Sequence, residues 1–367
     1  MDKFKTAGKY ILNFVLILAI GCLALYLTVG KEIGTVFEAV KTAKPFVLAV
    51  MALVMLIYYL IDAFILYLIC KARGYRLKLR QTFVTNMTGV LFSDLTPSAT
   101  GGQFAQVYVF HNQGIHAGQA SGILAVVFIT YQIVIISYAT IAMLVNAPAI
   151  FQNRQSILIA IIGFVVNVVI TGGIFLVTKS AKAHDFFIVK FIGFLAKIKL
   201  VKDYEKTSSE VSGSFREFRD ESSQLFSQRK LFIEVCLCHA VKLTLFYTLP
   251  FFAAMSLGVP VSVSDLPKFI SLAAAISLFN TFMPLPGASG GSEASFVMLF
   301  GFLGRTLVST AMLIWRVFTF YFGLLISLIT VAVAKETKGG IMKAASGKNC
   351  DSDKDAANIS PEAVSEE

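Results

Sequence analysis

The sequence predicts an all-α, polytopic membrane protein with about six full spans and two further segments that enter the bilayer without crossing it. Three observations predict this fold class. Hydrophobic residues make up 56% of the 367-residue chain. Only 15% of the residues are charged, against about 25% in a soluble domain. Long apolar runs alternate with short basic clusters, as in membrane spans and their loops. We therefore expect no water-soluble domain large enough to be an enzyme.

Six apolar runs reach the length of about 20 residues that a helix needs to cross a bilayer. The first run follows Lys3, Lys5 and Lys9, is longer than the apolar core of a signal peptide, and is followed by no small-x-small cleavage site. We interpret it as a retained span. The six runs are residues 10–30, 45–70, 118–145, 156–178, 231–257 and 306–334.

Two other apolar stretches, 81–112 and 267–303, are broken in the middle by proline and glycine. The breaks, residues 97–102 and 286–291, both read P-x-A-[S/T]-G-G and lie 189 residues apart. Each stretch has a full span on either side. The same pattern in the same context indicates an internal repeat.

The distribution of Lys and Arg predicts the orientation. Segments 1–9, 71–80, 179–230 and the tail from 335 carry 24 of the 32 Lys and Arg residues, and the connections on the other side carry six. Because cytosolic loops are enriched in Lys and Arg, both termini are expected in the cytosol. The first broken segment then enters from the cytosol and the second from outside, so the repeats are inverted.

The predicted domain organisation is simple. Residues 1–337 form one membrane domain. It contains a cytosolic insertion, 179–230, in which apolar residues recur at the spacing of an amphipathic helix. The tail, 338–367, has too few apolar residues to fold.

Pro/Gly-broken segments in corresponding places are typical of a transporter's binding site. Non-helical backbone persists at membrane depth only where protein or water covers it. The alternative is that two Gly-rich loops only allow tight helix packing. That alternative explains a single Gly-Gly pair well, but it does not explain a six-residue pattern that occurs twice in matching context.

Ionisable side chains inside a bilayer are costly and are therefore candidates for function. Arg316 and Lys242 lie near the middle of their spans, with His239 one turn before Lys242 on the same helix face. Glu293 opens the half-helix after the second break, and Asp94 lies just before the first. These cations and anions predict one polar cavity near the two breaks.

An anionic lipid headgroup that carries an amine would suit this set, because half-helix N-termini offer N–H groups and glycines allow close approach. A different possibility is that Glu293 and Arg316 only neutralise each other. For Asp62, a structural contact and a role in the site are equally compatible with the sequence. The candidate lipid-headgroup residues are Arg316, Glu293, Lys242, His239, Asp94, Gly101, Gly102, Gly290, Gly291, Pro97 and Pro286.

No cofactor, metal site or catalytic residue is predicted. The four histidines show no ligand spacing, and Cys236 and Cys238 point to different faces of a helix. The formal charge of +10 is spread over the loops, which suits anionic lipid headgroups better than nucleic acid. No phosphate-binding G-x-x-x-x-G-K-[S/T] loop is present. Movement of a substrate would have to follow a gradient or be coupled to an ion.

Several motifs together resemble one family over residues 10–335. The motifs are Thr96–Gly102 with Tyr108, then Pro284–Gly287 with Gly290 and Glu293, then Trp315-Arg316 with Tyr321. They are similar to the transmembrane region of lysylphosphatidylglycerol synthase, the multiple peptide resistance factor family, and to its stand-alone flippase-like relatives. The resemblance implies translocation of aminoacylated phosphatidylglycerol or a related lipid, and resistance to cationic antimicrobial peptides.

The resemblance has one departure. Full-length members carry a cytosolic aminoacyl-transferase domain after the membrane region, and here about 33 residues follow the last span. We expect a lipid flippase of the bacterial cytoplasmic membrane, moving an aminoacylated phosphatidylglycerol, another phospholipid, a glycolipid or a polyprenyl-linked lipid. The rivals are the membrane part of a lysyltransferase system with a separate synthase, and a non-transporting subunit. Membrane lipids are the expected partners; a lipid-modifying enzyme and a second copy of the chain stay open.

Overall fold

The computed structural model describes residues 38, 41–96, 99–147, 154–179, 223–224, 226–281, 288 and 290–334. Every regular element within these residues is a helix, and none of them forms a strand. The predicted first span, most of the insertion 179–230 and the tail 338–367 lie outside the described residues.

The long helices match the predicted spans closely. Four of the described segments, 45–72, 117–145, 229–256 and 307–333, are long and apolar enough to cross a membrane by length and composition. The apolar part of a fifth helix, Ala160–Gly173, is shorter. The long helices are α3 (Pro45–Ala72), α6 (Ala117–Val145), α8 (Arg154–Lys179), α11 (Arg229–Tyr247) continued by α12 (Leu249–Ser256), and α15 (Arg305–Arg316) continued by the π-helical turn η5 (Val317–Tyr321) and α16 (Phe322–Val333).

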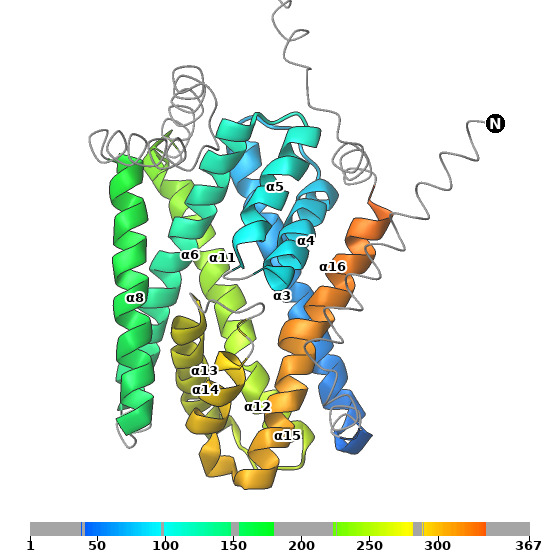
Figure 1. Ribbon diagram of the computed structural model, residues 1–367, viewed down its shortest axis with the longest axis vertical. Coiled ribbons are helices and arrows are strands. Elements are labelled where there is room, and N and C mark those ends of the chain that lie inside the picture. The colour runs from blue at the N-terminus through cyan, green and yellow to red at the C-terminus, as the bar shows by residue number, and fades with distance from the viewer. Residues whose placement is uncertain are drawn as a thin grey trace, which may run out of the picture.

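Each predicted broken stretch forms a pair of shorter helices. The first pair lies in the upper half of Figure 1 and the second in the lower half, so the two pairs extend toward the middle of the bundle from opposite ends. Short 3₁₀ turns, η2 (Val263–Asp265) and η4 (Gly301–Leu303), flank the second pair. The pairs are α4 (Leu79–Leu95) with α5 (Thr100–Asn112), and α13 (Leu266–Asn280) with α14 (Gly291–Leu299).

The spacing of the two breaks extends to the helices around them. Adding 189 to the bounds of α3, α4, α5 and α6 gives ranges that overlap α11–α12, α13, α14 and α15–α16 respectively. Ala99 and Ala288, which are equivalent at this spacing, have φ angles of 54° and 51°. They are the only non-glycine residues with positive φ among the described residues. Because an L-residue rarely adopts this conformation, the shared angle is a further likeness between these two positions.

Local chemistry ends α4 and begins α5. Thr96 precedes a proline, which disfavours helical geometry, and its backbone is extended at φ −113° and ψ 145°. The Thr96 hydroxyl donates to the Phe92 carbonyl at 2.6 Å and accepts from the Gly101 N–H at 2.9 Å. One side chain therefore serves both half-helices, which fixes the turn between them.

Glycines let α4 and α5 pack closely. A Cβ atom on Gly102 would lie 2.7 Å from the Gly89 carbonyl oxygen and would also overlap the Ser93 side chain. A Cβ on Gly89 would meet the Gln106 side chain of α5. The backbone carbonyl cannot yield as a side chain could, so the two half-helices depend on glycine at position 102.

Gly102→Ala is predicted to destabilise the protein by about 1–3 kcal/mol, because the added methyl group must push α5 away from α4. Gly172→Ala in α8 is the matched control. It has no atom within 4 Å of the added Cβ, and alanine favours a helix over glycine. Thermal unfolding in detergent should show a lower melting temperature for the first variant only. Equal melting temperatures would contradict the close packing.

The two ends of the bundle are predicted to face opposite sides of the membrane. In a cysteine-free background, Arg76→Cys before α4 and Val263→Cys in η2 supply exposed labelling sites. The excess of Lys and Arg around residue 76 predicts that an impermeant maleimide added to intact cells labels position 263 alone. Position 76 should react after permeabilisation. Labelling of both positions from one side would exclude the inverted arrangement.

Candidate functional site

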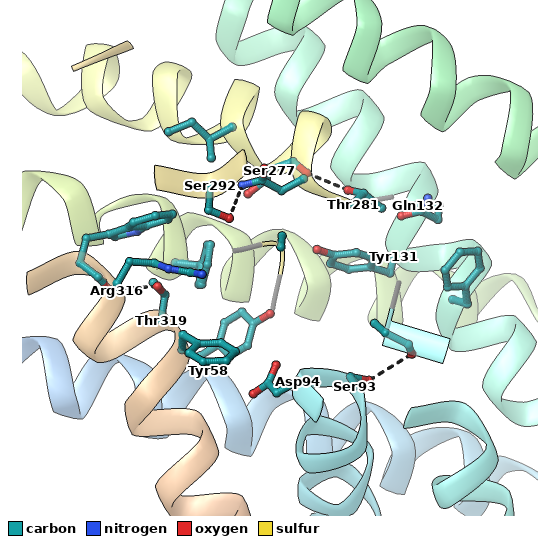
Figure 2. A pocket seen from close by; sticks show the side chains of 18 residues that line it. Tyr58, Ser93, Asp94, Tyr131, Gln132, Ser277, Thr281, Ser292, Arg316 and Thr319 are labelled. Atoms are coloured by element: carbon teal, nitrogen blue, oxygen red, sulfur yellow. Dashed lines mark hydrogen bonds between the residues drawn. The ribbon is translucent and has the colours of Figure 1, made fainter. Parts of the chain in front are cut away.

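A cavity of about 470 Å³ lies where the two breaks meet. Both left-handed alanines, Ala99 and Ala288, line it, so each break contributes backbone to the same space. Figure 2 shows its polar side chains converging from α3, α4, α6, α13, α14 and the α15–η5 helix. The cavity therefore joins the two halves of the repeat.

Arg316 is the cation of this cavity. The residue is only 6% exposed. Its Nε lies 2.6 Å from Glu293 Oε1, and its guanidinium carbon lies 5.0 Å from the centre of the Phe320 ring. The second oxygen of Glu293 accepts the Gly290 N–H at 2.5 Å, at the start of α14. One carboxylate thus neutralises the buried arginine and caps the half-helix.

The π-helical turn η5 begins directly after Arg316. Thr319 and Phe320, within this turn, line the cavity together with Arg316. A π turn is uncommon and occurs frequently at functional sites, because its wide backbone changes the direction of neighbouring side chains. Here it lies in the one long helix that supplies the cation.

Asp94 brings a carboxylate into the cavity from α4. Figure 2 shows it near Tyr58, with Arg316 on the α15 side of the same space. Among the described residues, Asp94 has no ion-pair partner. The cavity is therefore lined by Arg316, which is paired with Glu293, and by a second carboxylate from the other half of the repeat.

Lys242 and His239 line a second cavity of about 270 Å³ that adjoins the first. The two cavities share Ser93, Phe128 and Tyr131. The single polar cavity that the sequence predicted is thus divided into two.

The charge of Lys242 is satisfied within the protein. Its ammonium forms an ion pair with Asp62 of α3 and lies 5.0 Å and 4.7 Å from the centres of the Tyr58 and Tyr131 rings. His239 Nε2 lies 3.2 Å from the Thr130 hydroxyl. These contacts join α11 to α3 and α6. Lys242 and His239 therefore line the adjoining cavity and not the central one.

The glycines of the breaks have structural contacts of their own. Gly101 and Gly102 pack against α4. The N–H groups of Gly101 and Gly290, near the starts of the two half-helices, are bonded to Thr96 and Glu293. Gly290 has a φ angle of 84°, which favours glycine, and Gly291 is the first residue of α14. Pro97 and Pro286 lie outside the described residues.

Asp62, whose role the sequence left open, is the partner of Lys242 and lines neither cavity. Several residues that do line the central cavity were not predicted from the sequence. The neutral residues Tyr58, Tyr131, Gln132, Asn280 and Thr319 gave no signal, because single polar residues are common in apolar runs.

Within the described residues, no group of three or more His, Cys, Asp or Glu side chains is placed to hold a metal ion.

The Asp62–Lys242 pair is predicted to be structural. Asp62→Asn alone leaves a buried ammonium without its counter-charge and should cost about 3–5 kcal/mol. Adding Lys242→Met should restore most of the melting temperature. Glu234→Gln is the control, because its pair with Lys230 spans 3.9 Å at an exposed position and such pairs contribute little. A double variant as unstable as Asp62→Asn would contradict the prediction.

Comparison with known proteins supplies the family. A search of curated proteins finds none that matches the chain. The family model described as the lysylphosphatidylglycerol synthase TM region matches residues 11–327. This range includes both breaks, Arg316 and nearly all of the long helices, and it agrees with the apolar character of those helices. The chain is a membrane protein and belongs to the family of lysylphosphatidylglycerol synthase transmembrane regions.

Proposed function

We propose that this protein moves lipid headgroups across the bacterial cytoplasmic membrane through the central cavity. One observation carries the proposal: two broken helix pairs from opposite ends of the bundle meet at a polar cavity with a buried arginine. A lipid headgroup needs a polar path through the apolar interior of a bilayer. A cavity bounded by both halves of a repeat provides such a path when either half moves.

The proposed arrangement in the membrane follows the charge distribution. About six helices span fully, α4–α5 and α13–α14 are re-entrant, and the two halves are inverted. Residues 1–337 form the membrane domain, with residues 179–230 and both termini in the cytosol. In this arrangement α4–α5 enters from the cytosol, and the loop before α13 faces outward.

Arg316 and Asp94 have complementary roles in the proposal. Arg316 binds the lipid phosphate, for which a guanidinium is well suited. Asp94 faces the same cavity and accepts a cationic amine, as on an aminoacylated phosphatidylglycerol. Glu293 keeps Arg316 neutralised between transport events. Related phospholipids and glycolipids with a phosphate fit the same pair.

The family description favours a second candidate, a membrane subunit that works beside a separate lipid-modifying synthase. In that case the cavity only stabilises the bundle. The two candidates differ in what happens when both charges of the Arg316–Glu293 pair are removed.

Arg316→Met alone is predicted to lower folding yield or lipid movement sharply, since the unpaired Glu293 would cost about 3–5 kcal/mol. Glu293→Gln alone should do the same, although the glutamine amide can still cap Gly290. The double variant should fold, because no unpaired charge remains. It should move phosphate-bearing lipid at least tenfold more slowly, because the headgroup has lost its cationic partner.

The assay is leaflet-resolved movement of acyl-labelled phosphatidylglycerol and lysyl-phosphatidylglycerol in proteoliposomes, with size-exclusion profiles as the measure of folding. Lys268→Met is the control. This lysine lies over the Phe302 ring near the start of α13 and outside the cavity. A folded double variant with full activity would remove the pair from the transport site and leave the subunit candidate.

A further inference from the structure

Gln132 of α6 lies in the wall of the central cavity and is fully buried. Its Nε2 donates to Asn167 Oδ1 at 3.2 Å and to the Thr171 hydroxyl at 3.5 Å, both on α8. Its Oε1 has no hydrogen-bond partner among the described residues. A buried amide oxygen without a donor is unfavourable, so this atom requires an explanation.

The orientation of the Gln132 amide is determined by its neighbours. Asn167 Nδ2 donates to the backbone carbonyls of Gly163 and Leu278, each at 2.7 Å. Carbonyl oxygens can only accept, so the nitrogen of Asn167 must face them and its oxygen must face Gln132. Gln132 must then present its nitrogen to Asn167. Its oxygen is left on the opposite side, and Figure 2 shows the oxygen of Gln132 toward the cavity interior.

The helix packing makes this network rigid. A Cβ atom on Gly163 would lie 2.8 Å from the backbone of Leu278 and Phe279, so α8 and the end of α13 are in close contact. Asn167 is also fully buried. The amide of Gln132 cannot rotate without giving up a bond to this network.

A second unpartnered acceptor lines the same cavity. Asn280, the last residue of α13, donates through Nδ2 to the Ser292 hydroxyl at 2.9 Å. Its Oδ1, like Gln132 Oε1, has no partner among the described residues. Both residues line the cavity. Figure 2 shows Gln132 on the side away from Arg316, whereas Ser292, the partner of Asn280, lies beside Arg316.

We infer that Gln132 forms a second subsite that binds hydrogen-bond donors of the lipid headgroup, while Arg316 binds the phosphate. This inference rests on the proposed function. The subsite accepts N–H or O–H groups and offers nothing to a headgroup without them. A headgroup with a phosphate at one end and an ammonium or hydroxyl at the other bridges the two subsites. Gln132 is therefore a specificity-determining residue.

The test compares three lipids that share a phosphate and differ in donors. Phosphatidylethanolamine has N–H donors, phosphatidylglycerol has O–H donors, and phosphatidylcholine has neither. Thermal stabilisation of the purified protein by each lipid measures binding, because a ligand of the folded state raises the melting temperature. For the wild type, the donor lipids should bind about fivefold more tightly than phosphatidylcholine, the usual effect of one hydrogen bond.

Gln132→Met should remove the preference for phosphatidylglycerol and reduce that for phosphatidylethanolamine, whose ammonium still meets Asp94, and it should leave phosphatidylcholine binding unchanged. The donor lipid whose binding is weakened shows whether the subsite binds an ammonium, a hydroxyl or both. Thr171→Val is the control, because it alters the same network while Asn167 still holds the amide, and it should keep the preference. An equal loss for all three lipids in Gln132→Met would show a structural role and overturn the inference.

The binding of the three lipids to the wild type also tests the subsite, even if Gln132→Met does not fold. Equal binding of the three lipids to the wild type would overturn the subsite. A binding preference without any movement of lipid in proteoliposomes would count against the proposed transport and in favour of the subsite. The failure of the proposed transport can therefore be distinguished from the failure of the subsite.

Discussion

The contact between Arg316 and Glu293 is the interaction on which the arrangement of the cavity depends. A guanidinium that is 6% exposed in an apolar bundle needs a counter-charge, because desolvating a lone charge costs far more than other interactions return. Glu293 supplies that charge, and its other oxygen accepts the N–H of Gly290, the residue before α14. The position of the last long helix and the position of the second break are thereby determined by the same carboxylate.

The two halves solve the same backbone problem with different chemistry. At each break, backbone N–H groups lose their helical partners inside a region with little water, and each must be satisfied. In the first half the neutral hydroxyl of Thr96 accepts the Gly101 N–H, and in the second half a carboxylate accepts the Gly290 N–H. In the second half the same carboxylate also holds the buried Arg316. The pseudosymmetric halves are electrostatically unequal.

Much of the fold could be predicted from the sequence, because length and hydropathy determine the long helices directly. The run 45–70 became α3, and the proline and glycine at 97–102 coincided with the end of α4 and the start of α5. The partner of Lys242 could not be predicted. It depends on the rotation of α3 about its axis, which only the packed bundle determines. The role of Gln132 also depends on packing, because its amide is oriented by Asn167 of another helix.

The π turn after Arg316 has a consequence for the origin of the two halves. A π turn accommodates one residue more than an α-helix over the same length. From Val317 onward, residues of α6 find identical counterparts 190 positions later instead of 189: Val127-Phe128 with Val317-Phe318, Tyr131 with Tyr321, Ile136-Ser137 with Ile326-Ser327, and Thr140 with Thr330. We infer that the halves descend from a duplicated ancestor and that one residue was inserted into the second copy. Arg316 directly precedes both the π turn and the stretch with the changed spacing, so the cation of the cavity lies at the boundary of the region in which the two copies differ.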